Sequence, residues 1–288
     1  FRRDLRLAGN PAFSDNYARH EGRVLGIFCF DRVFLSRPDF SERRFRFFLK
    51  TLLALRAELR DSGGDLLVLD EGPDPAFASL FAHLRKHPWG NPQLVTWNRD
   101  YEPFARERDA RLAVFFSEQG VATRTQNDHL LIEPHEVFRN TPQEGYQVFT
   151  PFSRRWLERF ETPEVQAKVE QQAKGLALLR KRIAGNAESF FKCTWSQFWG
   201  GPGPLADVLD DYAERLRAND ASLPPAGSKS ALQALDAFLA LVVAGQEEFQ
   251  VVQQVLLRLV EVASQLHRVL DLPAHLAGGV LVGQLAAG

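Results

Sequence analysis

Short apolar runs that alternate with helix-length amphipathic stretches are the feature that most restricts how the first 160 residues can fold. The longest run, VLGIFCF at 24–30, is followed by shorter runs at 66–69 and 94–97. Continuous apolar runs of this kind are typical of strands buried on both faces. The stretches between them place apolar side chains at helical spacing, and the first begins after Ser41, a suitable N-cap. Alternating strands and helices indicate βαβ units, so we expect an α/β fold with a doubly wound parallel sheet of five strands.

The alternation stops near residue 160, and the rest of the chain has a different pattern. We expect residues 1–160 to form the α/β domain and residues 161–230 to form a helical interdomain linker. Residues 231–288 begin like a further helical domain, but after about residue 240 Ala, Val, Leu, Gly and Gln dominate. Two interpretations of this tail stay open: a helical cap with one amphipathic face, or an irregular, out-of-frame translation of the region that should follow.

Charge and cysteine content exclude several classes of protein. The formal net charge is -1, so no global field draws the chain to nucleic acid or to a membrane surface. No apolar run approaches the ~18 residues of a membrane span, and no signal-peptide pattern opens the chain. Two cysteines are too few for a disulfide framework, so we predict a cytoplasmic protein. The chain has no methionine and opens at Phe1 on what reads as a strand end, so we expect a fragment that is truncated at least at its N-terminus.

Four segments combine charged, amide and aromatic side chains close to predicted strand ends, where an open α/β sheet binds its ligands. In chain order they are FRRDLRL and NPA within 1–12, WNRDYEP at 97–103, DHLLIEP at 128–134 and YQVFTPF at 146–152. Each also has a simpler interpretation as a solvated charged loop, an acidic helix start that suits the helix dipole, or aromatic packing. Asp100 fits a helix start less well because it precedes the helix.

In their order and spacing, these four segments resemble those of the photolyase/cryptochrome family of blue-light flavoproteins. The resemblance is clear over residues 1–160 and weaker to about residue 240. It implies that residues 1–160 correspond to the family's N-terminal domain. That domain has a flavodoxin-like fold and holds an auxiliary light-harvesting chromophore, the antenna.

The resemblance also bears on which chromophore is bound. Family members that bind a folate antenna have an Asn-Glu pair where this chain has Phe104 and Ala105, which favours a deazaflavin over a folate. Carried over residue by residue, the antenna pocket would be lined by Arg3, Phe30, Asp31, Asp100 and Glu102. Phe30 would stack on the ring, Asp100 would accept hydrogen bonds from the ring or the ribityl group, and Arg3 would counter negative charge. A domain without any antenna is the alternative, since many relatives carry none.

We do not expect this chain to contain the family's catalytic half. In the family, repair of cyclobutane pyrimidine dimers needs a C-terminal helical domain that holds FAD. Its FAD-phosphate segment should follow the stretch at 231–240 but does not appear, and neither does the later tryptophan-rich segment. We therefore predict no catalytic residue, no metal site, no FAD binding and no repair by this chain alone. In a full-length parent, the FAD domain and damaged DNA would be its partners, and the aromatic run 149–156 would contribute to the domain seam.

The leading hypothesis is thus the antenna domain of a deoxyribodipyrimidine photo-lyase, a carbon–carbon lyase, without its FAD half. A cryptochrome-type light-signalling or interaction module without repair activity is the alternative. A generic nucleotide-binding flavodoxin-like protein is a third hypothesis, but no glycine-rich phosphate loop follows any predicted strand.

Overall fold

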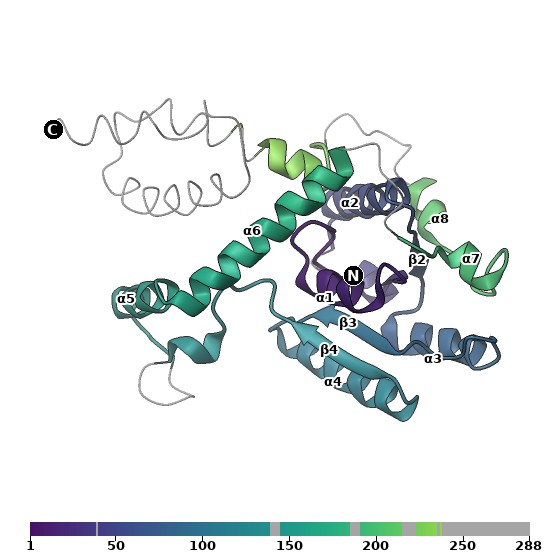
Figure 1. Cartoon of the computed structure of the whole chain (residues 1–288), viewed down its shortest axis with the longest axis horizontal. Helices are drawn as coiled ribbons and strands as arrows, with labels where there is room; N and C mark the ends of the chain where they lie inside the picture. Colours follow the sequence, from purple (N-terminus) through teal and green to yellow (C-terminus); the bar gives the residue numbers. More distant parts are fainter. Residues whose placement is uncertain (39, 139–144, 185–190, 215–222, 235–236, 238–288) are drawn as a thin grey trace. The chain divides into compact units, whose positions relative to one another are not determined.

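The computed structural model describes residues 1–38, 40–138, 145–184, 191–214, 223–234 and 237 (Figure 1). Backbone contacts divide the chain into two compact units. The first comprises Phe1–Leu130 with Ile183–Ser230, and the second comprises Leu131–Arg182 with Ala231–Gly288. The tail beyond residue 240, for which two interpretations were open, lies outside the described residues.

Four short strands in the first unit form two parallel pairs. They are β1 (Gly26–Cys29), β2 (Leu66–Leu69), β3 (Leu94–Asn98) and β4 (Ala122–Gln126). β1 pairs with β2 in the register Gly26↔Leu66, and β3 pairs with β4 in the register Leu94↔Ala122. Three strands coincide with the predicted apolar runs, and the parallel pairing confirms the α/β class. The described residues do not include a continuous sheet of five strands, so that part of the prediction is not confirmed.

Helices follow the strands as βα units require. Those of the first unit are α1 (Pro11–His20), the 3-10 helix η1 (Arg32–Ser36), α2 (Glu42–Asp61), α3 (Pro73–Leu84), α4 (Pro103–Glu118), α7 (Trp195–Trp199) and α8 (Leu209–Glu214). Ser41 caps α2 as predicted, because its hydroxyl accepts a 3.4 Å hydrogen bond from the N–H of Arg44. Gly120 follows α4 with φ at +71°, in the left-handed region that glycine adopts without strain.

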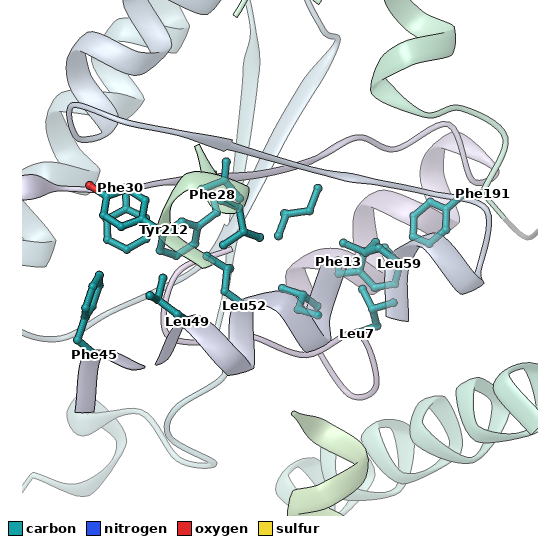
Figure 2. Packing of buried hydrophobic residues seen from close by; sticks show 14 residues of the cluster. Leu7, Phe13, Phe28, Phe30, Phe45, Leu49, Leu52, Leu59, Phe191 and Tyr212 are labelled. Carbon is teal, nitrogen blue, oxygen red and sulfur yellow. The ribbon is translucent and has the colours of Figure 1, made fainter. Parts of the chain in front are cut away.

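Helices cover both faces of the β1–β2 pair. On one face, Phe28 and Val68 pack in an aromatic-rich cluster with side chains of α1, α2 and α8 (Figure 2). On the other face, Ile27 and Leu67 pack with side chains of α3, α4 and α7. Successive strand residues point to opposite faces, so burial on both sides explains why the run at β1 is continuously apolar.

Residues 191–214, which we expected in the linker, contribute to this core. Phe191 and Tyr212 are buried in the cluster that contains α2. Trp195 is buried in the opposite cluster, and its indole N–H donates a 2.7 Å hydrogen bond to the carbonyl oxygen of Gly26. The α/β unit is therefore completed by chain that lies far along the sequence from its strands.

The second unit is smaller among the described residues. It contains the 3-10 helix η2 (Pro134–Val137), α5 (Phe149–Phe160) and α6 (Pro163–Ala184). Ile132 and Val165 are buried in its core. The Arg159 guanidinium lies 2.6 Å from a carboxylate oxygen of Glu136 and 2.8 Å from one of Glu164. In neither unit do the described helices include one with the length and apolar character needed to cross a membrane.

Candidate functional site

A buried hydrogen-bond network joins the first two sequence segments. Asp4, Asn10 and Asn98 are 6%, 1% and 3% exposed. The side-chain amide of Asn98 donates to Asp4 Oδ2 at 2.6 Å and to Asn10 Oδ1 at 2.9 Å. The side-chain amide of Asn10 donates to the same Asp4 oxygen at 3.0 Å, and its Oδ1 caps α1 by accepting from the N–H of Phe13. The network fixes the N-terminal segment and the start of α1 against the end of β3.

The charge of Asp4 is part of this network. Burial alone would raise the pKa of Asp4, but the N-terminal ammonium and hydrogen bonds from the Arg2 N–H and the Asn98 amide hold that pKa below its ordinary value. Asp4 therefore has a structural role, which the sequence analysis did not assign. The sequence marks one member of this network, because Asn10 directly before Pro11 is the pattern of an N-cap followed by proline at the first helical position.

Three of the predicted antenna residues form one charged cluster at the ends of the strands. Arg3 Nη1 lies 2.8 Å from Glu102 Oε1 and 3.5 Å from Asp100 Oδ1. The Asp100 side chain is 8% exposed, whereas those of Arg3 and Glu102 are 57% and 65% exposed. Burial would raise the pKa of Asp100, but the N–H groups of Tyr101 and Glu102 and the nearby arginines outweigh this effect and lower it. Asp100 is thus a fixed anion just before α4.

Phe30 and Asp31, the other two predicted residues, follow β1. Phe30 is 1% exposed, and its ring stacks on Tyr212 with centroids 4.5 Å apart and planes 9° apart (Figure 2). The Asp31 carboxylate accepts a 3.0 Å hydrogen bond from the N–H of Val33 and caps η1. One face of the Phe30 ring is therefore covered by α8, a contact that the sequence did not suggest.

One cavity of about 1160 Å³ brings these residues together. Its lining includes all five predicted residues, Arg3, Phe30, Asp31, Asp100 and Glu102. It also includes residues of β1 and β3, the two strands that the cavity separates. The volume exceeds the ~300–1,000 Å³ of ordinary ligand pockets, but the lining runs along both strands, from residues before them such as Val24 and Gln93 to the predicted residues at their carboxyl ends. The carboxyl ends are where an open α/β sheet binds its ligands. Apolar walls with a few charged groups suit a planar heteroaromatic ring.

The other two segments lie elsewhere. Asp128, from the third segment, accepts a 3.0 Å hydrogen bond from Arg6 Nη1, so this segment contacts the first one. The fourth segment belongs to the second unit, where Val148 and Phe149 are 62% and 76% exposed. Within the described part of the chain, no group of three or more His, Cys, Asp or Glu side chains is arranged to hold a metal ion.

Comparison with known proteins decides the family. The family model for DNA photolyase matches residues 1–171, more than half of the chain. The chain belongs to the DNA photolyase family. The resemblance noted in the sequence is thereby confirmed.

The relatives include both characterised and uncharacterised members. The deoxyribodipyrimidine photo-lyase of Halobacterium salinarum is 30% identical over 246 residues, which cover 82% of this chain and 44% of that protein. An uncharacterized 31.6 kDa protein of Synechococcus is 36% identical over 157 residues, 54% of this chain and 52% of its own length. Cryptochrome-2 of Gallus gallus is 31% identical over 177 residues, 60% of this chain and 28% of that protein. The chain thus spans about half, or less, of the curated relatives it matches.

A solved structure supports the fold. The bacterial class III photolyase from Agrobacterium tumefaciens superposes with a TM-score of 0.58 at 20% identity, over 83% of this chain and 43% of that one. At this identity the likeness concerns the fold alone, and it agrees with an α/β domain of the photolyase type.

Proposed function

We propose that the first unit is a light-harvesting antenna domain that binds a chromophore in the part of the cavity at the carboxyl ends of β1 and β3. The observation that carries this proposal is that five residues chosen from the sequence all line one cavity. They come from three separate places in the chain, and three of them form the charged cluster of Arg3, Asp100 and Glu102. Membership of the DNA photolyase family supplies the kind of ligand.

A deazaflavin fits the lining better than a folate does. Phe104 and Ala105 line the cavity where folate-binding members have an amide and a carboxylate, and neither can accept a hydrogen bond from a pterin through its side chain. Asp100 offers a fixed carboxylate, Arg3 offers a cation, and the aromatic side chains around Phe30 offer flat apolar surface. When bound, the chromophore would absorb light, and the protein would hold and orient it.

We propose a catalytic half only for a longer parent protein that would contain this chain. In that parent, an FAD domain would take excitation energy from the antenna, and damaged DNA would be the substrate. Val148, Phe149 and Phe152 of the second unit, all exposed, would pack in the domain seam. The chain described here would bind no FAD. We place the protein in the cytoplasm on its charge and cysteine content, and we expect the antenna domain to complete a five-stranded sheet.

Fluorescence titration with a 5-deazaflavin, in parallel with a folate, tests the antenna proposal. Saturable deazaflavin binding that Asp100→Asn weakens by about tenfold, a loss of about 1.4 kcal/mol, is the expected result. Glu107→Gln is the matched control, because Glu107 is an exposed carboxylate of α4 that does not line the cavity. Equal deazaflavin binding by the unsubstituted chain and by Asp100→Asn would contradict the assigned site. Tighter binding of the folate than of the deazaflavin would contradict the assigned type of chromophore.

A cryptochrome-type signalling module is the second candidate. Cryptochrome-2 of Gallus gallus is similar to this chain over 177 residues, so cryptochromes as well as photolyases are among its relatives. Light-dependent repair of a thymine-dimer oligonucleotide by the complete parent protein would favour the photolyase. Absence of repair in an FAD-loaded parent would favour the signalling module.

A further inference from the structure

A second cavity lies in the first unit at the carboxyl ends of β1 and β2. Its volume is about 300 Å³, at the lower end of the ~300–1,000 Å³ that ligand pockets span. Its lining comes from η1, from the residue after β2 and from the α8 region, and consists of Arg32, Leu35, Asp70, Val208, Asp211 and Tyr212. None of these residues lines the larger cavity assigned to the chromophore. The ligand that fits here is therefore a small one.

A pair of stacked rings separates the two cavities. Phe30 lines the larger cavity and Tyr212 lines the smaller one, and their parallel rings lie 4.5 Å apart (Figure 2). Tyr212 is only 8% exposed, and the stack on Phe30 holds its ring in place. The small cavity thus has a fixed aromatic wall. The π-face of such a ring attracts cations.

The other walls are also held by the core of the α/β unit. The N–H of Val208 donates a 3.0 Å hydrogen bond to the carbonyl oxygen of Val68 in β2. Arg56, which is buried in α2, forms an ion pair with Asp210 of α8. Leu35 and Val208 pack against the aromatic-rich cluster, so they offer apolar surface that needs no rearrangement. A ligand would meet a preformed site.

The charges in the lining determine which kind of ligand fits. The Asp70 carboxylate is already bonded, because Oδ1 accepts from the Glu71 N–H at 3.0 Å and Oδ2 accepts from Arg32 Nε at 2.7 Å. The Arg32 guanidinium also forms a hydrogen bond with the Tyr212 side chain. In contrast, the exposed Asp211 carboxylate makes no hydrogen bond or ion pair with any residue that the structure describes. One carboxylate in this cavity is therefore available to a ligand.

We propose that this cavity binds a small organic ammonium ion, a primary amine on a short alkyl chain. The ammonium group pairs with Asp211 and lies against the Tyr212 ring, and the alkyl chain lies against Leu35 and Val208. An anion would face the carboxylate of Asp211, while Arg32 is already occupied by Asp70. The site lies outside the chromophore cavity, so neither the inference nor its test depends on the antenna proposal.

Titration of the full chain with n-butylammonium chloride, followed by two-dimensional NMR of the backbone amides without chromophore, tests the proposal. Saturable shifts of the amides of Asp211 and Tyr212 are expected, with a Kd on the order of 1 mM for a ligand of so few atoms. n-Butanol and butyrate have similar chains without the positive charge, and neither should bind. Asp211→Asn keeps the side-chain volume but removes the negative charge, and it should weaken butylammonium binding about tenfold.

Glu107→Gln is the matched control, because it also neutralises an exposed carboxylate, and Glu107 lines neither cavity. Binding that Asp211→Asn weakens and Glu107→Gln leaves unchanged supports the site. Shifts that rise linearly without saturation, or equal binding of n-butanol, would overturn it. Unweakened binding by Asp211→Asn, or shifts centred on Arg3 and Asp100 of the larger cavity, would overturn it as well. Asp211 is exposed and pairs with no described residue, so its replacement should leave the fold intact.

Discussion

Replacing Asp4 should destabilise the first unit in a pH-dependent way. Asp4 is buried and accepts hydrogen bonds from the side-chain amides of Asn10 and Asn98. In Asp4→Ala, each of these amides loses one acceptor in a site that water does not reach. An unsatisfied buried polar group costs about 1–3 kcal/mol, and each amide keeps at least one other acceptor, so the expected loss is about 2–4 kcal/mol. That is a large part of the ~5–15 kcal/mol by which domains are stable.

The sign of the pH dependence follows from the pKa of Asp4, which the N-terminal ammonium and hydrogen bonds from the Arg2 N–H and the Asn98 amide lower in spite of burial. A carboxyl group with a depressed folded-state pKa stabilises the fold fully above its unfolded pKa of about 3.9. That contribution is lost as the pH falls through the folded-state pKa. Asp4→Asn keeps the side-chain volume but cannot ionise, so its stability should approach that of the parent as the pH falls below about 4.

Urea denaturation at several pH values, followed by tryptophan fluorescence, measures these differences. Glu107→Gln is the control, because an exposed carboxylate change should stay within about 0.5 kcal/mol at every pH. Two results would refute the reasoning: Asp4→Ala as stable as the parent near neutral pH, or a gap between parent and Asp4→Asn that does not narrow in acid. Either would mean that the Asp4 carboxylate contributes little to the folded state.

Three further changes probe other parts of the structure. Tyr212→Ala should lower the free energy of unfolding by about 3 kcal/mol, because it empties a buried aromatic site, and thermal denaturation measures this loss. Unchanged stability would contradict the packing role of Tyr212. If the uncovered Phe30 ring then stacks on the chromophore, fluorescence titration should show tighter deazaflavin binding. Arg56→Ala should cost about 1.5–3 kcal/mol, as judged by urea denaturation, because it removes a buried side chain that pairs with Asp207 and Asp210, whose side chains are 29% and 76% exposed. Phe149→Ser should reduce self-association in analytical ultracentrifugation with little change in melting temperature, because the ring is 76% exposed; a large fall in melting temperature would place the ring in a core instead.

Local patterns predicted the elements of the first unit well. The runs at 66–69 and 94–97 became β2 and β3, because two-sided burial leaves an unmistakable apolar signature. The helix expected after Ser41 begins at Glu42, the first residue of α2, since Ser41 supplies a local cap. The convergence of Asp31 and Asp100 on one cavity followed from the rule that strand ends meet at one edge of a sheet.

Contacts between distant residues could not be predicted in the same way. The hydrogen bond from Asn98 to Asp4 joins residues 94 positions apart, and no local pattern marks an asparagine as the partner of a buried carboxylate. Tyr212 lies in a stretch that reads as a linker, yet it covers the ring of Phe30. Only the packing of α8 against β1 shows that this tyrosine covers one face of that ring.

The return of residues 191–214 to the α/β core has a consequence for synthesis on the ribosome. Phe191, Tyr212 and Trp195 complete the clusters on the two faces of β1, and the N–H of Val208 donates a 3.0 Å hydrogen bond to Val68. The four strands leave the exit tunnel long before these residues are translated. Until this distant stretch emerges from the ribosome, both apolar faces of the β1–β2 pair in the nascent domain therefore stay incompletely covered. Translation speed between β4 and α8 should thus govern how much newly made protein is captured by chaperones.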